Sequence, residues 1–349
     1  MKKFVLAIFL IAIALASIVV EVRATNLSTV TLTVNPDQPN STQYPYDAYS
    51  LVTLNETMIY NNYQTIQYPT DGLVGFQIQD SNNNPMVIRT LSTGGSIPDS
   101  IPATIEQAYL CNGNEAEITS TPIPTASNPF VPTIYFSVYN NQASAQQVLV
   151  TLNEFDSNGV PISVASQNMG SVPAYTSEES ILGFNIPSSA HYGTANAYVD
   201  VYNAWPMQGG VPLGQEKAFT FTITGGSAFQ GTPVTTASQN GSPVNNFNMT
   251  FRLPQYINCA LGTYEAYSTA SYLGVSGSTT TPFGVGELAD INGDGQVNFN
   301  DITTFVALYI NYFTDHVYSP QIDLLHTGST INFNDITLFV GYYILAWSS

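Results

Sequence analysis

Alternation between apolar and polar residues runs through most of this 349-residue chain and limits what it can fold into. From Thr25 to about Gly286, runs such as "STVTLTV", "IYFSVYN" and "AFTFTIT" change character at every second residue and are rich in Val, Ile, Thr, Tyr and Phe. Gly, Pro, Asn and Ser separate the runs. Because successive side chains of a strand point to opposite faces, this pattern predicts a mainly β protein of tandem β-sandwiches.

The boundaries between the predicted domains lie where Gly and Pro become frequent. The stretch 226–286 is short for a sandwich, so it either forms a small third β domain or shares strands with its neighbour. The predicted division is a signal peptide (1–24), a first β-sandwich (25–103), a second β-sandwich (104–225), a small β domain (226–286) and a C-terminal module (287–349).

A short internal repeat supports more than one sandwich. "QIQDSNNNPMVI" and "NEFDSNGVPISV" each place Asp-Ser-Asn shortly before a Pro, with Asp80 in the first copy and Asp156 in the second. Each copy lies between two strand-like runs. Asx and Gly residues supply hairpin-turn chemistry, so we interpret both copies as turns rather than as calcium sites.

The first residues read as a secretory signal, which places the remaining chain outside the cytoplasm. Lys2 and Lys3 precede an apolar stretch from Phe4 to Val20, and a possible cleavage site ends at Ala24. The alternative is a retained N-terminal anchor, since this stretch approaches the roughly 20 residues of a membrane-spanning helix. A membrane partner is expected only in that second case.

The charge of the chain argues against nucleic acid as a partner. Charged residues make up 9% of the sequence, and cleavage after Ala24 would leave 23 acids and three bases, a formal charge near −20. Binding to nucleic acid needs clustered Lys and Arg that neutralise phosphates. The three remaining bases are scattered along the chain as Arg89, Lys217 and Arg252.

Two further features bear on an extracytoplasmic setting. Cys111 and Cys259 either form a disulfide there or remain thiols, because their separation in sequence does not show whether they meet. N-x-[S/T] sequences predict glycosylation at a few asparagines. These sequences begin at Asn26, Asn40, Asn55, Asn240 and Asn248.

Beyond residue 286 the pattern changes to a helical period. "NFNDITTFVALYINYF" and "NFNDITLFVGYYILAW" each have apolar residues at helical spacing, after an Asn-Phe-Asn-Asp start that fits a helix cap with an acid in the first turn. The last sixty or so residues are therefore predicted as two related loop–helix units. The apolar positions are Ile302, Phe305, Val306, Tyr309 and Ile310 in the first unit, and Ile336, Phe339, Val340, Tyr343 and Ile344 in the second.

The sequence "DINGDGQVNFND", from Asp290 to Asp301, has the spacing of a calcium loop. Calcium prefers about six to eight oxygen ligands, and alternating side chains on a tight loop deliver them. Gly295 stands where the loop must turn sharply, and Val297 is expected to point into the core. The predicted ligands of one Ca²⁺ are Asp290, Asn292, Asp294, Gln296 (through its carbonyl), Asn298 and Asp301.

The second loop departs from this pattern. Asp323 and Asp335 match the first and last ligands, but Leu325 and Thr327 stand where Asn and Asp are expected. Two carboxylates and a hydroxyl make a poor calcium site. We expect one firmly bound calcium per chain, with the second unit serving as a packing partner for the first.

The doubled loop–helix pattern, closed by Asp and with one helix after each loop, resembles a type I dockerin over residues 287–349. The resemblance implies a small α-helical module with an EF-hand-like calcium loop that docks into a cohesin-like domain of a partner protein. Neither helix carries Lys or Arg, which dockerins of cellulosomes often show. A partner of another kind, such as a surface-layer component, therefore stays open.

The β region resembles the Ig-like modules of secreted archaeal surface proteins. The similar stretches include "IYFSVYNNQASAQQVLVTLNEFDSNGVPISV", "NAYVDVYN" and "LVGFQIQDSNNNPMVIRTLSTG". The resemblance implies tandem Ig-like β-sandwiches and an extracellular location. It implies no chemistry.

Motifs for catalysis are missing from the sequence. It contains neither G-x-S-x-G nor H-E-x-x-H, and we interpret Glu154, Asp156 and Asp200 as solvent-facing acids rather than as a glycosidase pair. We therefore expect no enzyme. We expect a secreted or cell-surface structural or adhesion protein that docks a partner through its C-terminal module; the alternative is a polysaccharide-binding or polysaccharide-degrading component recruited through that module.

Overall fold

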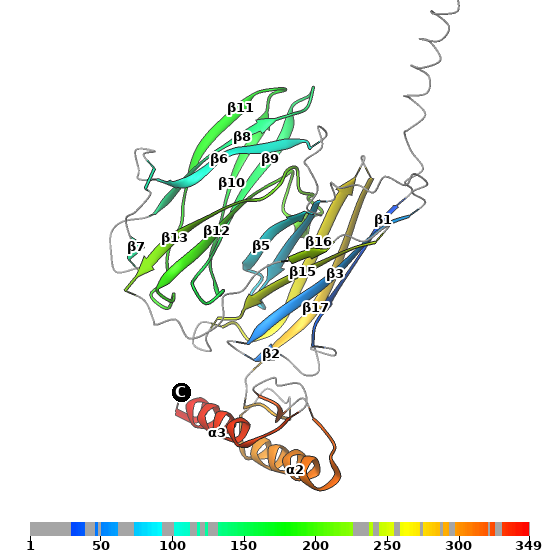
Figure 1. Cartoon of the computed structure of the whole chain (residues 1–349), viewed down its shortest axis with the longest axis vertical. Coiled ribbons are helices and arrows are strands. Elements are labelled where there is room, and N and C mark those ends of the chain that lie inside the picture. The colour runs from blue at the N-terminus through cyan, green and yellow to red at the C-terminus, as the bar shows by residue number, and fades with distance from the viewer. Residues whose placement is uncertain are drawn as a thin grey trace, which may run out of the picture.

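The computed structural model of the chain shows a mainly β protein that ends in two helices (Figure 1). The described residues are 29–38, 46–47, 50–61, 73–92, 101–111, 117–118, 123–124, 132–225, 237–239, 244–254, 259–272, 275–286, 289–292, 297–319, 322–324 and 330–348. The predicted signal segment 1–24 lies outside them. Among the described residues, no helix is both long and apolar enough to cross a membrane.

One β-sandwich, called the outer sandwich, contains strands from both ends of the β region. Its two sheets have the strand orders β1-β3-β15-β14 and β2-β17-β16-β4-β5. The strands are β1 (Thr29–Pro36), β2 (Tyr46–Asp47), β3 (Leu51–Asn61), β4 (Leu73–Gln79), β5 (Pro85–Ser92), β14 (Ala237–Gln239), β15 (Val244–Arg252), β16 (Gly262–Tyr272) and β17 (Val275–Gly286).

The second β-sandwich, called the inserted sandwich, is formed by the strands between β5 and β14. Its sheets have the orders β10-β9-β12-β13-β7 and β11-β8-β6. The elements are β6 (Ala103–Cys111), β7 (Ile123–Pro124), β8 (Thr133–Asn140), β9 (Gln146–Phe155), β10 (Pro161–Val172), β11 (Ser177–Gly183), β12 (Gly193–Tyr202), the short 3₁₀ helix η1 (Pro206–Gln208) and β13 (Lys217–Thr224).

The strands of residues 237–286 complete the outer sandwich, which differs from the separate small β domain predicted for 226–286. β15 is antiparallel to β3, with Phe247 opposite Glu56, and β16 is antiparallel to β4, with Ser268 opposite Phe76. Alternation shows that a strand buries one face, but it does not show which distant strand lies beside it. The nesting of one sandwich inside the other was therefore not predictable from local pattern.

The two sandwiches share the strand topology of their five-stranded sheets, in agreement with the predicted repeat. The sheet β2-β17-β16-β4-β5 corresponds strand by strand to β7-β13-β12-β9-β10, including the parallel pairs β17–β2 and β13–β7. In the β4–β5 turn, Asp80 Oδ1 accepts the Asn82 N–H at 2.9 Å, and in the β9–β10 turn Asp156 Oδ1 accepts the Asn158 N–H at 2.9 Å. Both sequences form the Asx turns that were predicted.

The same two turns tie each hairpin to the next strand of its sheet. Ser81 Oγ donates to the carbonyl of Leu261 at 2.7 Å, and Ser157 Oγ donates to the carbonyl of Tyr192 at 2.8 Å. The residue after each carbonyl is a glycine with a φ of +127° in one copy and +126° in the other, a conformation that other residues rarely adopt. This shared detail indicates that the sandwiches are two copies of one unit.

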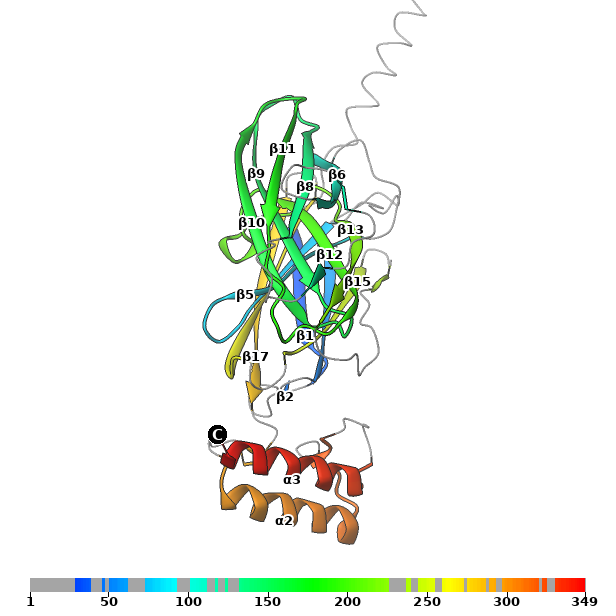
Figure 2. The ribbon, with the colours of Figure 1, turned by 90° about the vertical axis from the view of Figure 1, so that its left-hand side faces the viewer.

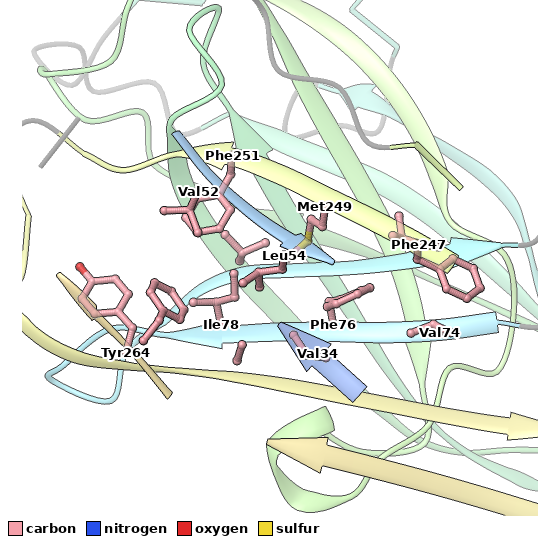
Figure 3. Packing of buried hydrophobic residues seen from close by; sticks show 14 of the residues in the cluster. Val34, Val52, Leu54, Val74, Phe76, Ile78, Phe247, Met249, Phe251 and Tyr264 are labelled. Atoms are coloured by element: carbon pink, nitrogen blue, oxygen red, sulfur yellow. The ribbon is translucent and has the colours of Figure 1, made fainter. Parts of the chain in front are cut away.

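Apolar side chains from both sheets fill the interior of the outer sandwich (Figure 3). Leu54 on β3 and Phe251 on β15 come from one sheet, and Phe76 and Ile78 on β4 come from the other; all are fully buried. Removing such side chains from water is the main contribution to the stability of a fold of this kind.

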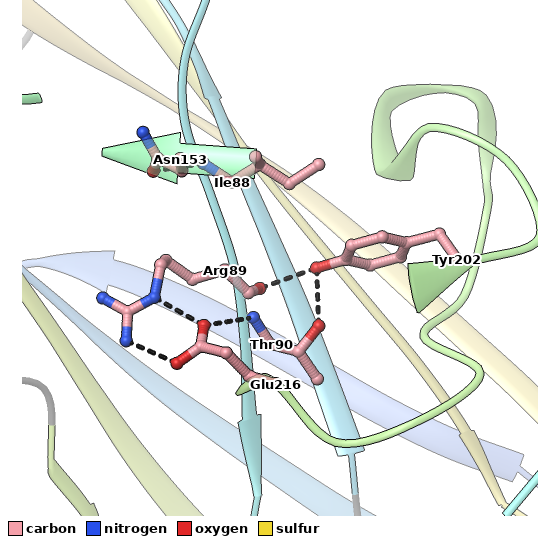
Figure 4. A network of polar contacts seen from close by, with 6 residues as sticks. All are labelled: Ile88, Arg89, Thr90, Asn153, Tyr202 and Glu216. Atoms are coloured by element: carbon pink, nitrogen blue, oxygen red, sulfur yellow. Dashed lines mark hydrogen bonds and ion pairs between the residues drawn. The ribbon is translucent and has the colours of Figure 1, made fainter. Parts of the chain in front are cut away.

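The edge strand β5 of the outer sandwich lies against the inserted sandwich, and we call this contact the seam (Figure 4). The Ile88 N–H on β5 donates to Asn153 Oδ1 on β9 at 3.0 Å. Tyr202 on β12 donates its hydroxyl to the Arg89 carbonyl at 2.8 Å and accepts from Thr90 Oγ1 at 2.8 Å. The seam therefore covers a strand edge that would otherwise be open to pairing with other chains.

The C-terminal module contains the two predicted helices, α2 (Phe299–Asp315) and α3 (Phe333–Ser348), which lie side by side (Figure 2). Asn298 caps α2 in a capping box with Asp301, as the sequence predicted. The rings of Phe305 on α2 and Phe339 on α3 stack with centroids 4.4 Å apart at 10°. The two units thus pack through equivalent residues.

Candidate functional site: the C-terminal loop and helix pair

The side chain of Asp301 closes the first loop. It is fully buried, and both of its oxygens accept backbone hydrogen bonds: Oδ1 from the Asn292 N–H at 3.1 Å and Oδ2 from the Asn298 N–H at 2.7 Å. One carboxylate therefore joins the beginning of the predicted calcium loop to its end, next to the helix N-terminus. That terminus favours the negative charge of Asp301.

The residues at the described ends of this loop fit a hard cation. Asp290, Asn292, Asn298 and Asp301 all supply oxygen atoms, and a carboxylate oxygen keeps a lone pair after it accepts one N–H. The stretch 287–349 contains no Lys or Arg that could balance the acids of the loop. A buried carboxylate needs a compensating charge, and Ca²⁺ would supply it.

Two predicted ligands, Asp294 and Gln296, lie outside the described residues. Within the described part of the chain, no group of three or more His, Cys, Asp or Glu side chains is placed to hold a metal ion. The described loop ends contribute two acids, Asp290 and Asp301, and the third acid of the predicted set is Asp294. Calcium binding at this loop therefore stays a prediction.

The second loop repeats part of this arrangement and replaces another part. Asp335 Oδ2 accepts the Asn332 N–H at 2.8 Å, as Asp301 accepts that of its own cap residue. Asp323, which is also buried, accepts a hydrogen bond from the Tyr318 hydroxyl at 2.6 Å. Burial and this hydrogen bond raise the pKa of Tyr318, so the hydroxyl keeps its proton. A protein donor thus occupies one oxygen of the carboxylate that would begin a second calcium site.

The interior of the module combines both loops and both helices. Val297 packs against this core, as the sequence predicted. The buried members come in equivalent pairs from the two units, apart from Ile331, whose counterpart Val297 is only partly buried. They are Ala289 and Ile322, Ile291 and Leu324, Phe305 and Phe339, together with Ile331.

Part of the predicted apolar pattern does not reach this interior. The predicted helices are confirmed, but Val306 and Ile310 on α2 are 48% and 52% exposed, and Val340 and Ile344 on α3 are 46% and 60% exposed. Helical spacing showed that these residues share one side of each helix. It did not show that this side faces outward.

These side chains belong to a larger set that we call the apolar face. On α2, exposed apolar residues follow one another at intervals of seven, four and three, and on α3 at seven and four, so each set forms a stripe along its helix. The stripe has no separate signal in the sequence, because its residues recur with the same helical period as the core residues. The members are Phe299, Val306, Ile310 and Phe313 on α2, and Phe333, Val340 and Ile344 on α3.

Two of the predicted glycosylation sequences lie in described strands. Asn55 on β3 and Asn248 on β15 are exposed and stand directly opposite each other in the sheet. Asn26, Asn40 and Asn240 lie outside the described residues.

Cys111 and Cys259 lie in different sandwiches and form no disulfide with each other. Cys111 is buried beside Thr133 in the inserted sandwich, and Cys259 lies near the Tyr264 hydroxyl of the outer sandwich. Of the two alternatives left open by the sequence, the structure has the two thiols.

The interpretation of Glu154, Asp156 and Asp200 as solvent-facing acids is wrong. All three side chains are buried, with 0%, 1% and 0% of their surfaces exposed. Asp200 lies on the face of the β9–β12 sheet that β5 covers across the seam. Glu154 points into the core of the inserted sandwich, and Asp156 lies in the β9–β10 turn, where it accepts backbone N–H groups. Alternation alone does not reveal a second covered face.

Comparison with known proteins identifies no family. No protein-family model and no curated protein matches the chain. It is distantly similar to the C-terminal domain of wzt, with 10% identity and a TM-score of 0.29 over 37% of this chain and 78% of that one. It is also distantly similar to a β-glucuronidase from Bacteroides uniformis, with 7% identity and a TM-score of 0.28 over 57% of this chain and 32% of that one. These similarities concern β-sandwich folds alone.

Proposed function

We propose that this chain is a secreted or cell-surface structural or adhesion protein whose C-terminal module binds calcium and docks a cohesin-like or other partner. The observation that carries the proposal is the apolar face. Large apolar side chains on a small module lose contact with water only when another surface covers them. Their equivalent positions on α2 and α3 give the module two similar stripes for such a contact.

Calcium would order the part of the module that presents this face. Asp290, Asn292, Asp294, Gln296, Asn298 and Asp301 are the residues that would hold the ion. The ion would supply positive charge to a loop whose closing carboxylate is fully buried. Because Asp301 also lies in the first turn of α2, a change at the loop is transmitted to the start of that helix.

The composition of the helices limits the chemistry of the partner. α2 and α3 contain no Lys or Arg, so an acidic partner surface would find no complementary charge on them. An apolar partner surface with polar residues at its rim fits better. Complete burial of a side chain such as Ile or Phe contributes about 1.5–3 kcal/mol, so half-exposed residues contribute roughly 1 kcal/mol each.

The two sandwiches would form the body that carries this module. The seam joins them through hydrogen bonds and buried side chains on β5, β9 and β12, so they are expected to move as one unit. A rigid carrier with a docking module at its end suits a structural or adhesive role.

The test uses the full secreted chain and a variant with both stripes changed, Ile310→Asp with Ile344→Asp. The partner is first identified by cross-linking on the native cell surface, then produced separately, and its affinity for each chain is measured with calcium and with a chelator. We expect at least a hundredfold weaker binding for the variant and for the chelated wild type.

Asn311→Asp is the control for added charge, because it places one of the two negative charges of the double variant at an exposed position of α2 outside the apolar face. It should bind like the wild type. Equal binding by the wild type and the double variant would show that the apolar face is not the docking surface.

A further inference from the structure

The β body encloses three carboxyl groups that lack adequate partners. They are Glu56, Glu154 and Asp200, with exposed fractions of 1%, 0% and 0%. Among the described residues, neither carboxyl oxygen of Glu154 or of Asp200 has a hydrogen-bond partner, and Glu56 has one for Oε1 alone. An ionised carboxylate in such surroundings is costly, whereas the neutral acid is tolerated.

Asp200 lies in the seam, where the positive charge is already matched. The Arg89 guanidinium donates to Glu216 through Nε at 2.6 Å and through Nη2 at 2.7 Å (Figure 4). The Cζ atom of Arg89 also lies 3.3 Å from the centre of the Tyr198 ring. Asp200 faces this group from β12, together with Tyr202. An ionised Asp200 would therefore add an unmatched negative charge beside a neutral pair.

The electrostatics at Asp200 follow from these neighbours. Burial raises the pKa of Asp200 well above its ordinary range, and the negative charge of Glu216 raises it further. Arg89 and the Thr90 hydroxyl act in the opposite direction and offset this only in part.

Glu154 lies on the inner face of β9, in the same row as Val150 and Leu152 of the inserted core. Burial raises its pKa well above the ordinary range; the only opposing influences are Ser163 on β10 and its own backbone. No charged group among the described residues contributes. Glu154 is therefore held as a neutral acid in an apolar interior.

Glu56 occupies the corresponding kind of place in the outer sandwich. It stands between Leu54 and Met58 on the inward face of β3, and the Ser268 hydroxyl on β16 donates to its Oε1 at 2.5 Å. Burial raises its pKa to about 8, although the Ser268 hydrogen bond lowers it. No charged side chain among the described residues faces it.

Asp156 is a buried carboxylate in the same β body that does have hydrogen-bond donors. Its oxygens accept the backbone N–H groups of Asn158, Val160 and His191, and the His191 ring lies 2.6 Å from Oδ2. Glu56, by contrast, has one hydroxyl donor, and among the described residues Glu154 and Asp200 have none in hydrogen-bond geometry.

We infer that the β body is stabilised by protons: Glu56, Glu154 and Asp200 are carried as neutral acids, so the folded chain is most stable in acidic medium and weakens as the pH rises through neutrality. Two of the groups lie inside the sandwich cores and the third lies in the seam. Both sandwiches and the seam between them are accordingly most stable at acidic pH.

The direction in which stability changes with pH follows from proton binding. Between the ordinary pKa of a carboxyl group and its raised value, the folded chain keeps a proton that the unfolded chain has released, so raising the pH favours unfolding. Each group changes the folding equilibrium about tenfold per pH unit in that window, which is about 3–5 °C in melting temperature for a body of this size. For Glu56 the window extends to a pKa of about 8.

The test is thermal unfolding of the full chain from pH 4 to pH 8.5, followed by the β signal in circular dichroism. The wild type should melt at its highest temperature in the acidic part of the range. Glu154→Gln and Asp200→Asn replace each neutral acid by a neutral group of the same shape. Each should match the wild type near pH 4 and exceed it at pH 8, with a flatter pH dependence.

Glu178→Gln is the control, because it removes an exposed acid on β11 and so reports the general repulsion among the many surface acids. Its pH dependence should follow that of the wild type. A wild-type melting temperature that is level or rises from pH 4.5 to pH 8 would overturn the inference, as would equal pH slopes for the wild type and both buried-acid variants. Glu56→Gln carries the test if either of the other variants fails to fold.

Discussion

Gly75 on β4 leaves room for the ring of Tyr202, which joins the inserted sandwich to the outer sandwich. A Cβ at this position on β4 would lie 2.6 Å from Cε1 of Tyr202 and 3.2 Å from the hydroxyl oxygens of Tyr202 and Thr269. Carbon atoms in contact normally lie about 3.5–4 Å apart. In Gly75→Ala the Tyr202 ring must therefore move by about 1 Å.

The cost of this movement follows from what holds the ring. Tyr202 is fully buried, and its hydroxyl is fixed by the Arg89 carbonyl and the Thr90 hydroxyl, each at 2.8 Å. Overpacking costs about 1–3 kcal/mol, and each weakened hydrogen bond adds up to about 1 kcal/mol. Gly75→Ala should lower the free energy of unfolding by about 2–4 kcal/mol, or the melting temperature by about 5–15 °C.

A double-mutant cycle separates this effect from any general effect on β4. Chemical denaturation is measured for the wild type, Gly75→Ala, Tyr202→Ala and the double variant. Without the ring, the added methyl group has room, so Gly75→Ala should cost nothing in the Tyr202→Ala background. The predicted coupling energy is about 2–4 kcal/mol.

Gly341→Ala provides the control, because a Cβ there meets no atom within 4 Å. It should leave the body unchanged and stabilise α3 by about 0.5–1 kcal/mol. Two results would contradict a clash between the added methyl group and the Tyr202 ring. One is a free energy of unfolding for Gly75→Ala within about 0.5 kcal/mol of the wild type; the other is an equal loss with and without the Tyr202 ring.

Three further predictions concern other parts of the chain. Arg89→Met should lower the free energy of unfolding in urea by about 3–5 kcal/mol, because it leaves the largely buried Glu216 without its cation. Adding Glu216→Gln should restore part of this loss, and no restoration would contradict the pairing. Asn332→Ala removes the side chain that accepts the Asn334 N–H and should destabilise α3 by about 1 kcal/mol. Circular dichroism should show a loss of helical ellipticity, and an unchanged signal would show that this cap contributes nothing. Peptide mass spectrometry of the native protein should find a glycan on Asn55 or Asn248, whose exposed side chains stand opposite each other; finding both unmodified would rule out glycosylation of this face.

The strands and helices were largely predictable because their signals are local. The run "QQVLVTLNEF" alternates and forms β9, and "NFNDITTFVALYINYF" carries both the cap and the helical period of α2. The Asp-Ser-Asn repeat predicted two related sandwiches, since turn chemistry depends on a few neighbouring residues.

What was not predictable depends on contacts between distant parts of the chain. β15 pairs with β3, although the whole inserted sandwich separates the two strands along the chain, and nothing in the sequence of β15 specifies that neighbour. Burial of Glu154 and Asp200 follows from packing between strands that are far apart in sequence. The outward direction of Ile310 and Ile344 likewise depends on how α2 and α3 pack together.

Calcium binding at the first C-terminal loop is a prediction from the sequence that the described residues leave to experiment. Six oxygen-bearing residues at calcium-loop spacing were identified from sequence, and the closing Asp301 is buried and linked to both ends of the loop. The second loop has lost two of its acidic or amide positions and holds Asp323 through Tyr318. This difference makes the number of bound ions a direct test.

Calorimetric titration of the full chain with Ca²⁺ at neutral pH is the most direct test of a calcium-ordered docking module. We expect one tight site per chain, lost in Asp290→Asn and kept in Asp323→Asn, with a gain in helical signal on binding. No calcium binding, or two equivalent sites that both variants reduce alike, would contradict it.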